Sequence, residues 1–286
     1  MTSAFGARLR SALAERGPLC VGIDPHEGLL AEWGMDASAA GVREFGLRVV
    51  EAAAGRVGVV KPQVSFFERW GAAGYAALEE VMATARAEGL LVIADAKRGD
   101  IGTTMDGYAA AWLTAGAPLE ADALTVSPYL GPDSLRGTIA TAVRADKGLF
   151  VLAATSNPEG FGLQSAEVLV ADAQEGQTVA DWVAHGVAWA NGSAVAAGGL
   201  GSIGLVVGAT VDRDTIGLGD TALEGAPILA PGFGAQGALP SDLHRIFGPH
   251  ARNVVASESR SILSAGPGGI ADAITTRNAE YRRTRA

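Results

Sequence analysis

Three charged residues follow an apolar stretch closely enough to act together: Asp95, Lys97 and Asp100. Residues 90–93 before them read Leu-Leu-Val-Ile, which predicts a buried β-strand. Side chains alternate between the two faces of a strand, so Asp95 and Lys97 should point the same way. Gly99 should then let the chain turn and present Asp100. The sequence therefore predicts two carboxylates and one ammonium group converging at the end of a strand.

Two interpretations of this cluster compete. The simpler one is an ion-pair network that closes the strand. However, burying charges costs free energy unless they are paired, and only 19% of the residues in this chain are charged. Concentrating three of them after a core strand is more typical of a working site, because strongly coupled charges gather where chemistry is done.

Short apolar runs rich in β-branched residues recur along the chain, with helical patterns between them. This alternation is typical of a parallel sheet covered by helices. The candidate strands are residues 19–24, 57–61, 90–97, 121–127, 149–155, 203–209, 227–231 and 253–257. Eight such units predict an α/β fold of the (β/α)₈ TIM-barrel type, with its active site at the carboxyl ends of the strands. A doubly wound sheet is the alternative, but no Gly-x-Gly-x-x-Gly opens a helix after the first strand.

Polar side chains that serve the site should therefore lie at the carboxyl ends of the strands. Besides the cluster after the third strand, three other strand ends carry a candidate. Asp24 follows the first strand, Lys61 ends the second and Ser156 follows the fifth. Each has an ordinary alternative: a turn aspartate before proline, a lysine that extends its ammonium to water, and a loop serine. Residues 161–177, after the fifth strand, form a long connection and are a candidate lid or an additional helix.

The last two strand ends carry a pattern suited to phosphate. Residues 232–237 read Gly-Phe-Gly-Ala-Gln-Gly and include Gln236 and Gly237, and Arg260 lies in a Ser-Arg-Ser sequence after the eighth strand. Glycines let backbone N–H groups approach an anion, and arginine offers a fixed pair of donors. In TIM barrels the loops after strands seven and eight commonly form the phosphate site.

Composition narrows the class of protein. The 286 residues contain no linker or long apolar span, which predicts one domain over residues 1–286. The net charge of -9 argues against nucleic-acid and anionic-membrane partners. The first 13 residues have helical spacing rather than a signal-peptide pattern, so a cytoplasmic location is expected. Cys20 is the only cysteine and should be a packed core thiol.

The Asp95-x-Lys97-x-x-Asp100-Ile101 pattern resembles the signature of the orotidine 5′-phosphate decarboxylase family, in particular its long bacterial, mycobacterial-type branch. The resemblance implies decarboxylation of orotidine 5′-phosphate to UMP and CO₂ in pyrimidine synthesis, with no metal ion and no cofactor. It also implies that Lys97 protonates C6 of the pyrimidine within an array that Asp95, Asp100 and Lys61 complete.

The same resemblance implies roles for the other strand-end residues. Asp24 would contact the ribose, Ser156 the pyrimidine edge, and Gln236, Gly237 and Arg260 the phosphate. The resembled enzymes are homodimers with shared active sites, in which the counterparts of Asp100, Ile101 and Thr104 reach the site of the partner subunit.

Two other functions remain as alternatives. A magnesium-dependent sugar-phosphate decarboxylase or aldolase of the same suprafamily would carry an acidic metal ligand where this chain has Lys61. A noncatalytic sensor of a phosphorylated ligand would be expected to have lost a member of the charge array. All four members, Lys61, Asp95, Lys97 and Asp100, are present.

Overall fold

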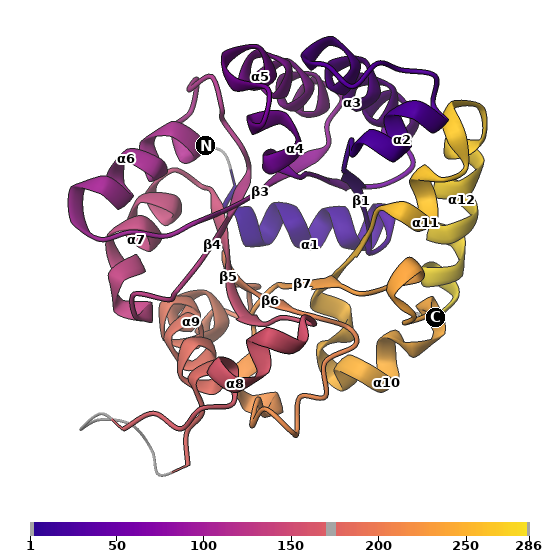
Figure 1. Ribbon diagram of the computed structural model, residues 1–286. Coiled ribbons are helices and arrows are strands. Elements are labelled where there is room, and N and C mark those ends of the chain that lie inside the picture. The colour runs from indigo at the N-terminus through magenta and orange to yellow at the C-terminus, as the bar shows by residue number, and fades with distance from the viewer. Residues whose placement is uncertain (1–2, 170–175, 285–286) are drawn as a thin grey trace.

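Eight parallel strands close into a barrel in the computed structural model, which describes residues 3–169 and 176–284 (Figure 1). Each strand pairs with its neighbours in sequence, and β1 pairs with β8 to complete the ring. The strands are β1 (Leu19–Ile23), β2 (Val59–Pro62), β3 (Leu91–Arg98), β4 (Ala123–Val126), β5 (Gly148–Ala154), β6 (Ile203–Val207), β7 (Ile228–Pro231) and β8 (Val254–Glu258). The predicted TIM barrel is confirmed, and no strand end differs from its predicted position by more than two residues.

Helices surround the barrel (Figure 1). Within the described residues, none combines the length and apolar character that crossing a membrane requires. The α-helices are α1 (Phe5–Arg16), α2 (Glu27–Glu32), α3 (Ala39–Ala53), α4 (Val64–Glu68), α5 (Gly71–Ala87), α6 (Gly102–Leu113), α7 (Arg136–Arg144), α8 (Phe161–Gln164), α9 (Val179–Ala196), α10 (Leu243–Phe247), α11 (Arg260–Leu263) and α12 (Gly266–Thr284).

Helix α3 illustrates how the sequence builds this outer layer. Ser38 caps its first turn by accepting a hydrogen bond from the backbone N–H of Gly41, at 3.1 Å. Val42, Phe45 and Val49 recur at helical spacing and are fully buried in the core cluster between strands and helices. The opposite face carries charged side chains, so the helix has one face for the core and one for water.

Helix α1 lies across the amino-terminal end of the barrel and is not part of the outer ring of helices (Figure 1). Its buried side chains Phe5, Leu9 and Leu13 form a separate core cluster with residues inside the barrel. Phe5 meets Phe150 of β5 edge-on, with ring centroids 6.1 Å apart. Each such side chain contributes roughly 2 kcal/mol when fully buried. The barrel is therefore closed at this end, and its open end lies at the carboxyl ends of the strands.

Cys20 of β1 belongs to this inner cluster and is 0% exposed, as predicted for a core thiol. Burial raises the pKa of Cys20 to about 12 even though the nearby Lys61 acts to lower it. The thiol therefore stays protonated and shielded at neutral and mildly alkaline pH, and a protonated thiol is a poor nucleophile.

We expect no reaction of native protein with a disulfide reagent at pH 8, and one equivalent of reaction per chain in denaturant, because Cys20 is the only cysteine. The released chromophore measures both. Rapid stoichiometric labelling of the folded protein would show that the amino-terminal end of the barrel opens readily. A parallel reaction with glutathione, a freely accessible thiol, serves as the control that the reagent is active.

Candidate active site

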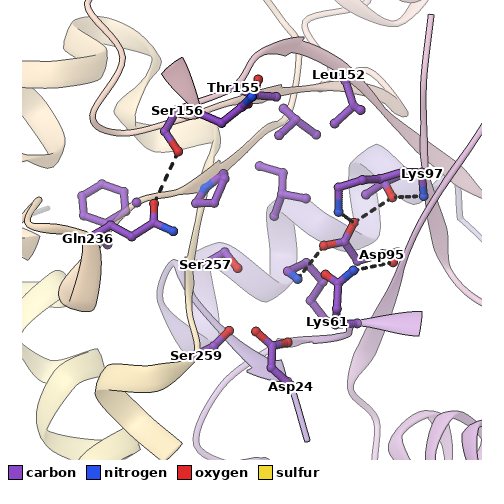
Figure 2. A pocket seen from close by; sticks show the side chains of 18 of the residues that line it. Asp24, Lys61, Asp95, Lys97, Leu152, Thr155, Ser156, Gln236, Ser257 and Ser259 are labelled. Carbon is purple, nitrogen blue, oxygen red and sulfur yellow. Dashed lines mark hydrogen bonds and ion pairs between the residues drawn. The ribbon is translucent and has the colours of Figure 1, made fainter. Parts of the chain in front are cut away.

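A cavity of about 360 Å³ opens at the carboxyl ends of the strands and gathers most of the predicted site residues (Figure 2). Its walls come from loops that lie far apart in the sequence and meet only because the barrel closes. The predicted residues that line it are Asp24, Lys61, Asp95, Lys97, Ser156, Gln236 and Arg260.

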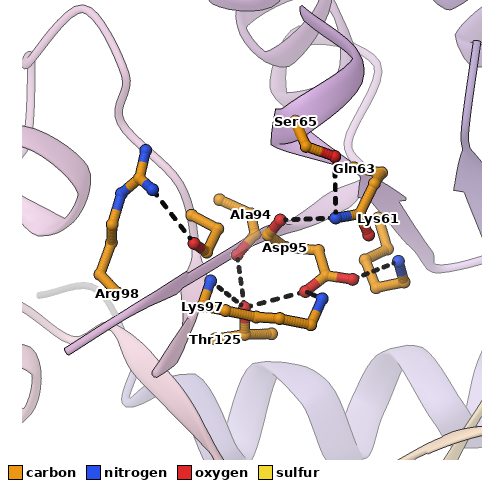
Figure 3. Close-up of polar contacts among 9 residues, drawn as sticks. Lys61, Gln63, Ser65, Ala94, Asp95, Lys97, Arg98 and Thr125 are labelled. Atoms are coloured by element: carbon orange, nitrogen blue, oxygen red, sulfur yellow. Dashed lines mark hydrogen bonds and ion pairs between the residues drawn. The ribbon is translucent and has the colours of Figure 1, made fainter. Parts of the chain in front are cut away.

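The polar centre of this cavity is a carboxylate held between two lysines (Figure 3). Asp95 Oδ2 lies 2.8 Å from Lys61 Nζ, and Asp95 Oδ1 lies 2.6 Å from Lys97 Nζ. The two lysines differ in exposure, since the Lys61 side chain is 8% exposed and that of Lys97 is 47% exposed. Lys61 is thus a buried structural cation, whereas the Lys97 ammonium is available to a molecule in the cavity.

The pKa values of Asp95 and Lys61 are both shifted toward the ionised form. Burial alone would raise the pKa of Asp95, but the charges and hydrogen bonds of Lys61 and Lys97 hold that pKa far below its usual range. Burial would lower the pKa of Lys61, but the charges of Asp95 and Asp24 outweigh it and the pKa is raised. Because the folded pKa of Asp95 is depressed, its contribution to stability is present at neutral pH and is lost as acid protonates the carboxylate.

Thr125 of β4 completes the array, and this role was not predicted from the sequence. Its hydroxyl donates to Asp95 Oδ1 at 3.0 Å and accepts the backbone N–H of Lys97 at 2.9 Å. Thr125 is 1% exposed within an otherwise apolar strand. A buried hydroxyl needs a partner, so its place near the end of a core strand was the available signal.

The backbone of β3 departs from regular pleating where it carries these residues. Ala94 pairs with Leu124 and Arg98 pairs with Val126, so residues 95–97 of β3 lie opposite the single Thr125 of β4. Within this bulge Lys97 has φ of 48°, a left-handed conformation that costs a non-glycine residue about 1–3 kcal/mol. Such strain persists only where surrounding contacts fix it, and here it directs the Lys97 side chain to Asp95.

The role assigned to Gly99 from sequence is wrong. The left-handed residue of this segment is Lys97, and Gly99 is not among the residues with positive φ. A Cβ at Gly99 would instead lie 2.7 Å from the carbonyl oxygen of Ser127. Glycine is required here because the β3 segment passes very close to the backbone that follows β4.

Arg98 anchors the far side of the same bulge. Its guanidinium donates to Glu68 Oε1 at 2.9 Å and to the Tyr75 hydroxyl at 3.3 Å. It also lies over the ring of Trp112 of α6, 5.9 Å from the ring centroid. These contacts tie the strained end of β3 to the helices outside the barrel, while Lys97 faces the cavity.

Asp24 and Lys61 form the floor of the cavity near β1 and β2. Asp24 Oδ1 is buried and has no hydrogen-bond partner in the protein. An unpaired carboxylate oxygen costs free energy, and at the wall of a cavity it is suited to accept a hydroxyl of a ligand. Ser257 and Ser259 of the β8 end stand close by and add further hydroxyl groups (Figure 2).

The other end of the cavity is formed by the loops after β5, β7 and β8. The Ser156 hydroxyl donates to Gln236 Oε1 at 3.5 Å, so these two loops touch across the cavity mouth (Figure 2). Arg260 lies at the start of α11 and is exposed, which leaves its guanidinium accessible. Gly237 is not part of the cavity wall and lines a neighbouring hollow with Asp212 and Arg245.

Asp100, Ile101 and Thr104 do not join the cavity of their own chain. Asp100 Oδ1 accepts the backbone N–H of Ile101 at 2.8 Å. Among the described residues, no ion pair joins Asp100 to Lys61 or Lys97, both of which bind Asp95. Ile101 is 61% exposed and Thr104 is also exposed. The array within one chain therefore contains Lys61, Asp95 and Lys97 but not Asp100.

The candidate lid over residues 161–177 begins with the short helix α8. Gln164 of this helix is tied to Thr155 by two hydrogen bonds, of 3.0 Å to its backbone N–H and 2.6 Å to its hydroxyl. Residues 170–175 of the predicted segment lie outside the described residues.

Known proteins resemble this chain over most of its length. The family model of the orotidine 5′-phosphate decarboxylase / HUMPS family matches residues 17–268. The orotidine 5′-phosphate decarboxylase of Streptomyces coelicolor is 54% identical over 265 residues, which cover 92% of this chain and 91% of that protein.

Solved structures show the same similarity over nearly the whole chain. A Streptomyces avermitilis structure described as an orotidine 5′-phosphate decarboxylase superposes with a TM-score of 0.91 at 47% identity, covering 99% of this chain and 96% of that one. The Leishmania donovani OMP decarboxylase superposes with a TM-score of 0.76 at 30% identity, covering 99% and 98%. This chain therefore belongs to the orotidine 5′-phosphate decarboxylase / HUMPS family.

Proposed function

We propose that this protein decarboxylates orotidine 5′-phosphate to UMP and CO₂ in pyrimidine synthesis in the cytoplasm, using neither a metal ion nor an organic cofactor. The observation that carries the proposal is the Lys97 ammonium, which Asp95 holds at 2.6 Å and which faces the cavity with its side chain 47% exposed. The family membership and the 54% identity to a decarboxylase support the choice of substrate.

The proposed reaction makes a specific demand on the protein. When the bond between C6 of the pyrimidine and the carboxylate carbon breaks, CO₂ leaves and its electron pair stays on C6. That carbanion lies in the ring plane, where no neighbouring carbonyl can delocalise it. Fixed positive charge close to C6 is therefore the available means of stabilisation.

Lys97 would meet this demand in two ways. Its ammonium would pair with the developing carbanion, and it would then transfer a proton to C6 to give UMP. The neutral amine would regain a proton from water, so the net reaction consumes one proton and releases one CO₂. Asp95 would hold the Lys97 ammonium in place beforehand, and Lys61 would balance the negative charge of Asp95 from the buried side.

The remaining residues would bind the parts of the substrate that do not react. Asp24, with its unpaired Oδ1, would accept a ribose hydroxyl, and Ser156 would contact the pyrimidine edge. Gln236 and Arg260 would hold the phosphate, with Gly237 shaping the turn that carries Gln236. Phosphate binding would close these loops and so contribute to turnover as well as affinity.

Metal-dependent chemistry on a sugar phosphate is the competing activity. Lys61 argues against it, because its ammonium, raised in pKa and 2.8 Å from Asp95, occupies a position where it opposes a divalent cation at that carboxylate.

The absorbance of orotidine 5′-phosphate should fall on addition of the protein, at a rate that is unchanged by prior dialysis against a chelator. The reason is that the positive charge proposed to stabilise the carbanion is the Lys97 ammonium and not a metal ion. Activity that the chelator abolishes and magnesium restores would contradict the metal-free mechanism, and no decay under either condition would contradict the substrate assignment.

We further infer that the active protein is a homodimer in which Asp100, Ile101 and Thr104 complete the partner's site. In support, these residues are solvent-accessible beside the cavity face, and Ile101 exposes 61% of its surface. Tyr129 and Leu130, after β4, are also large apolar residues in exposed positions, at 76% and 51%. Exposed apolar side chains of this size indicate an interaction surface.

A mixed-dimer experiment tests the shared site. Lys97→Ala and Asp100→Ala should each be inactive alone, and the two proteins should be dissociated, mixed equally and reassociated. In a mixed dimer one site carries both lesions and the other carries neither, so random pairing should restore about a quarter of wild-type sites. If mixed dimers form, as shown by two affinity tags, and no activity returns, Asp100 acts within its own chain.

A further inference from the structure

Glu258, the last residue of β8, is a buried carboxylate that the proposed reaction does not use. It is 1% exposed and lies next to the loop that carries Arg260. A carboxylate removed from water costs several kcal/mol unless its oxygens are satisfied by donors. The position of these donors indicates what the carboxylate holds in place.

Both oxygens of Glu258 are engaged. Oε2 accepts a hydrogen bond from the Ser261 hydroxyl of α11, one residue after Arg260. Oε1 accepts the hydroxyl of Tyr281 of α12 at 2.7 Å, and Arg277 of α12 places Nε 3.5 Å from Oε2. Glu258 therefore joins the loop after β8 to the carboxyl-terminal helix, which lies beside α11 in Figure 1.

The loop after β7 rests on the same carboxylate. A Cβ at Gly234 would lie 2.3 Å from Glu258 Oε2 and 2.4 Å from Ser261 Oγ, so only glycine allows the contact. Gly234 opens the 3₁₀ turn Gly234–Gln236 that presents Gln236. The ring of Tyr281 also meets Phe233, which lines the cavity, edge-on with centroids 5.6 Å apart.

We propose that Glu258 is a positioning residue for the phosphate subsite: with Tyr281 and Ser261 it fixes the two loops that carry Gln236 and Arg260. The inference rests on the proposed function, because it assumes that these two residues hold the substrate phosphate. Glu258 itself is not among the residues that line the cavity, so it would act through its neighbours. Its negative charge is offset by Arg277, so it need not repel the phosphate.

This role makes the effect of losing Glu258 depend on the ligand. Loosening the two loops weakens contacts to a phosphate, whereas the array of Lys61, Asp95 and Lys97 is held by ion pairs that do not involve Glu258 and keeps its geometry. A general loss of stability would instead weaken every ligand alike. Comparing a nucleotide with its nucleoside therefore separates the two explanations.

The test compares Glu258→Gln with wild type in binding UMP, by calorimetry, and uridine, by competition. Glutamine keeps the shape but removes the charge and replaces one acceptor oxygen with a donor. We expect UMP affinity to fall at least tenfold and uridine affinity to change less than about twofold. Tyr281→Phe, a milder change that removes one hydroxyl, should lower UMP affinity in the same direction and serves if Glu258→Gln does not fold.

Glu120→Gln is the matched control, because it also removes a poorly exposed carboxylate from an ion pair, here with Lys147 at 2.6 Å, at the closed end of the barrel. Its UMP-to-uridine ratio should equal that of wild type. Equal losses for UMP and uridine in Glu258→Gln, or no loss in it and in Tyr281→Phe, would overturn the inference. A wild-type protein that binds UMP no better than uridine would instead refute the proposed phosphate site.

Discussion

The site depends on one carboxylate, Asp95, shared between two lysines. Each oxygen of the Asp95 carboxylate forms an ion pair with a different lysine. Together the two ion pairs compensate the free-energy cost of burying the Asp95 charge. The consequence is an asymmetric array, in which buried Lys61 is fixed and Lys97 remains half exposed to the cavity. The left-handed backbone of Lys97 and the bulge around it are local strain that these ion pairs, Thr125 and Arg98 together hold in place.

The two ends of the barrel have separate roles. At the amino-terminal end α1 packs Phe5 and Leu9 against the strand interiors and provides a closed apolar base. At the carboxyl-terminal end the strands terminate in charged and hydroxyl-bearing residues, which lie around an open cavity. Lys61 joins the two regions, because it stands between the apolar layer that contains Cys20 and the polar wall above.

Features set by local sequence pattern were predictable, and features set by long-range register were not. The eight strands follow from their apolar, β-branched composition, and the cavity residues follow from the rule that strand ends face the site. The bulge opposite Thr125, by contrast, depends on how β3 and β4 align, which no short stretch of sequence encodes. The contacts of Glu258 join residues from β8, α11 and α12. No sequence motif distinguishes these residues from other polar residues of helices and strands. Asp100 could be identified as a site candidate from its motif, but the sequence alone did not show that it stays apart from Lys61, Asp95 and Lys97 within one chain.

In the proposed reaction the Lys97 ammonium, placed by Asp95, stabilises the carbanion and protonates it, so removing that ammonium and restoring it chemically is a direct test. Lys97→Cys should lose several orders of magnitude in turnover of orotidine 5′-phosphate, each about 1.4 kcal/mol of barrier. Alkylation with 2-bromoethylamine then rebuilds an ammonium of nearly the same length at that position, while buried Cys20 is spared. We expect activity to return in proportion to the fraction of residue 97 that is modified, measured by mass spectrometry. Turnover within about tenfold of wild type before alkylation, or no recovery after complete alkylation of a folded protein, would contradict it.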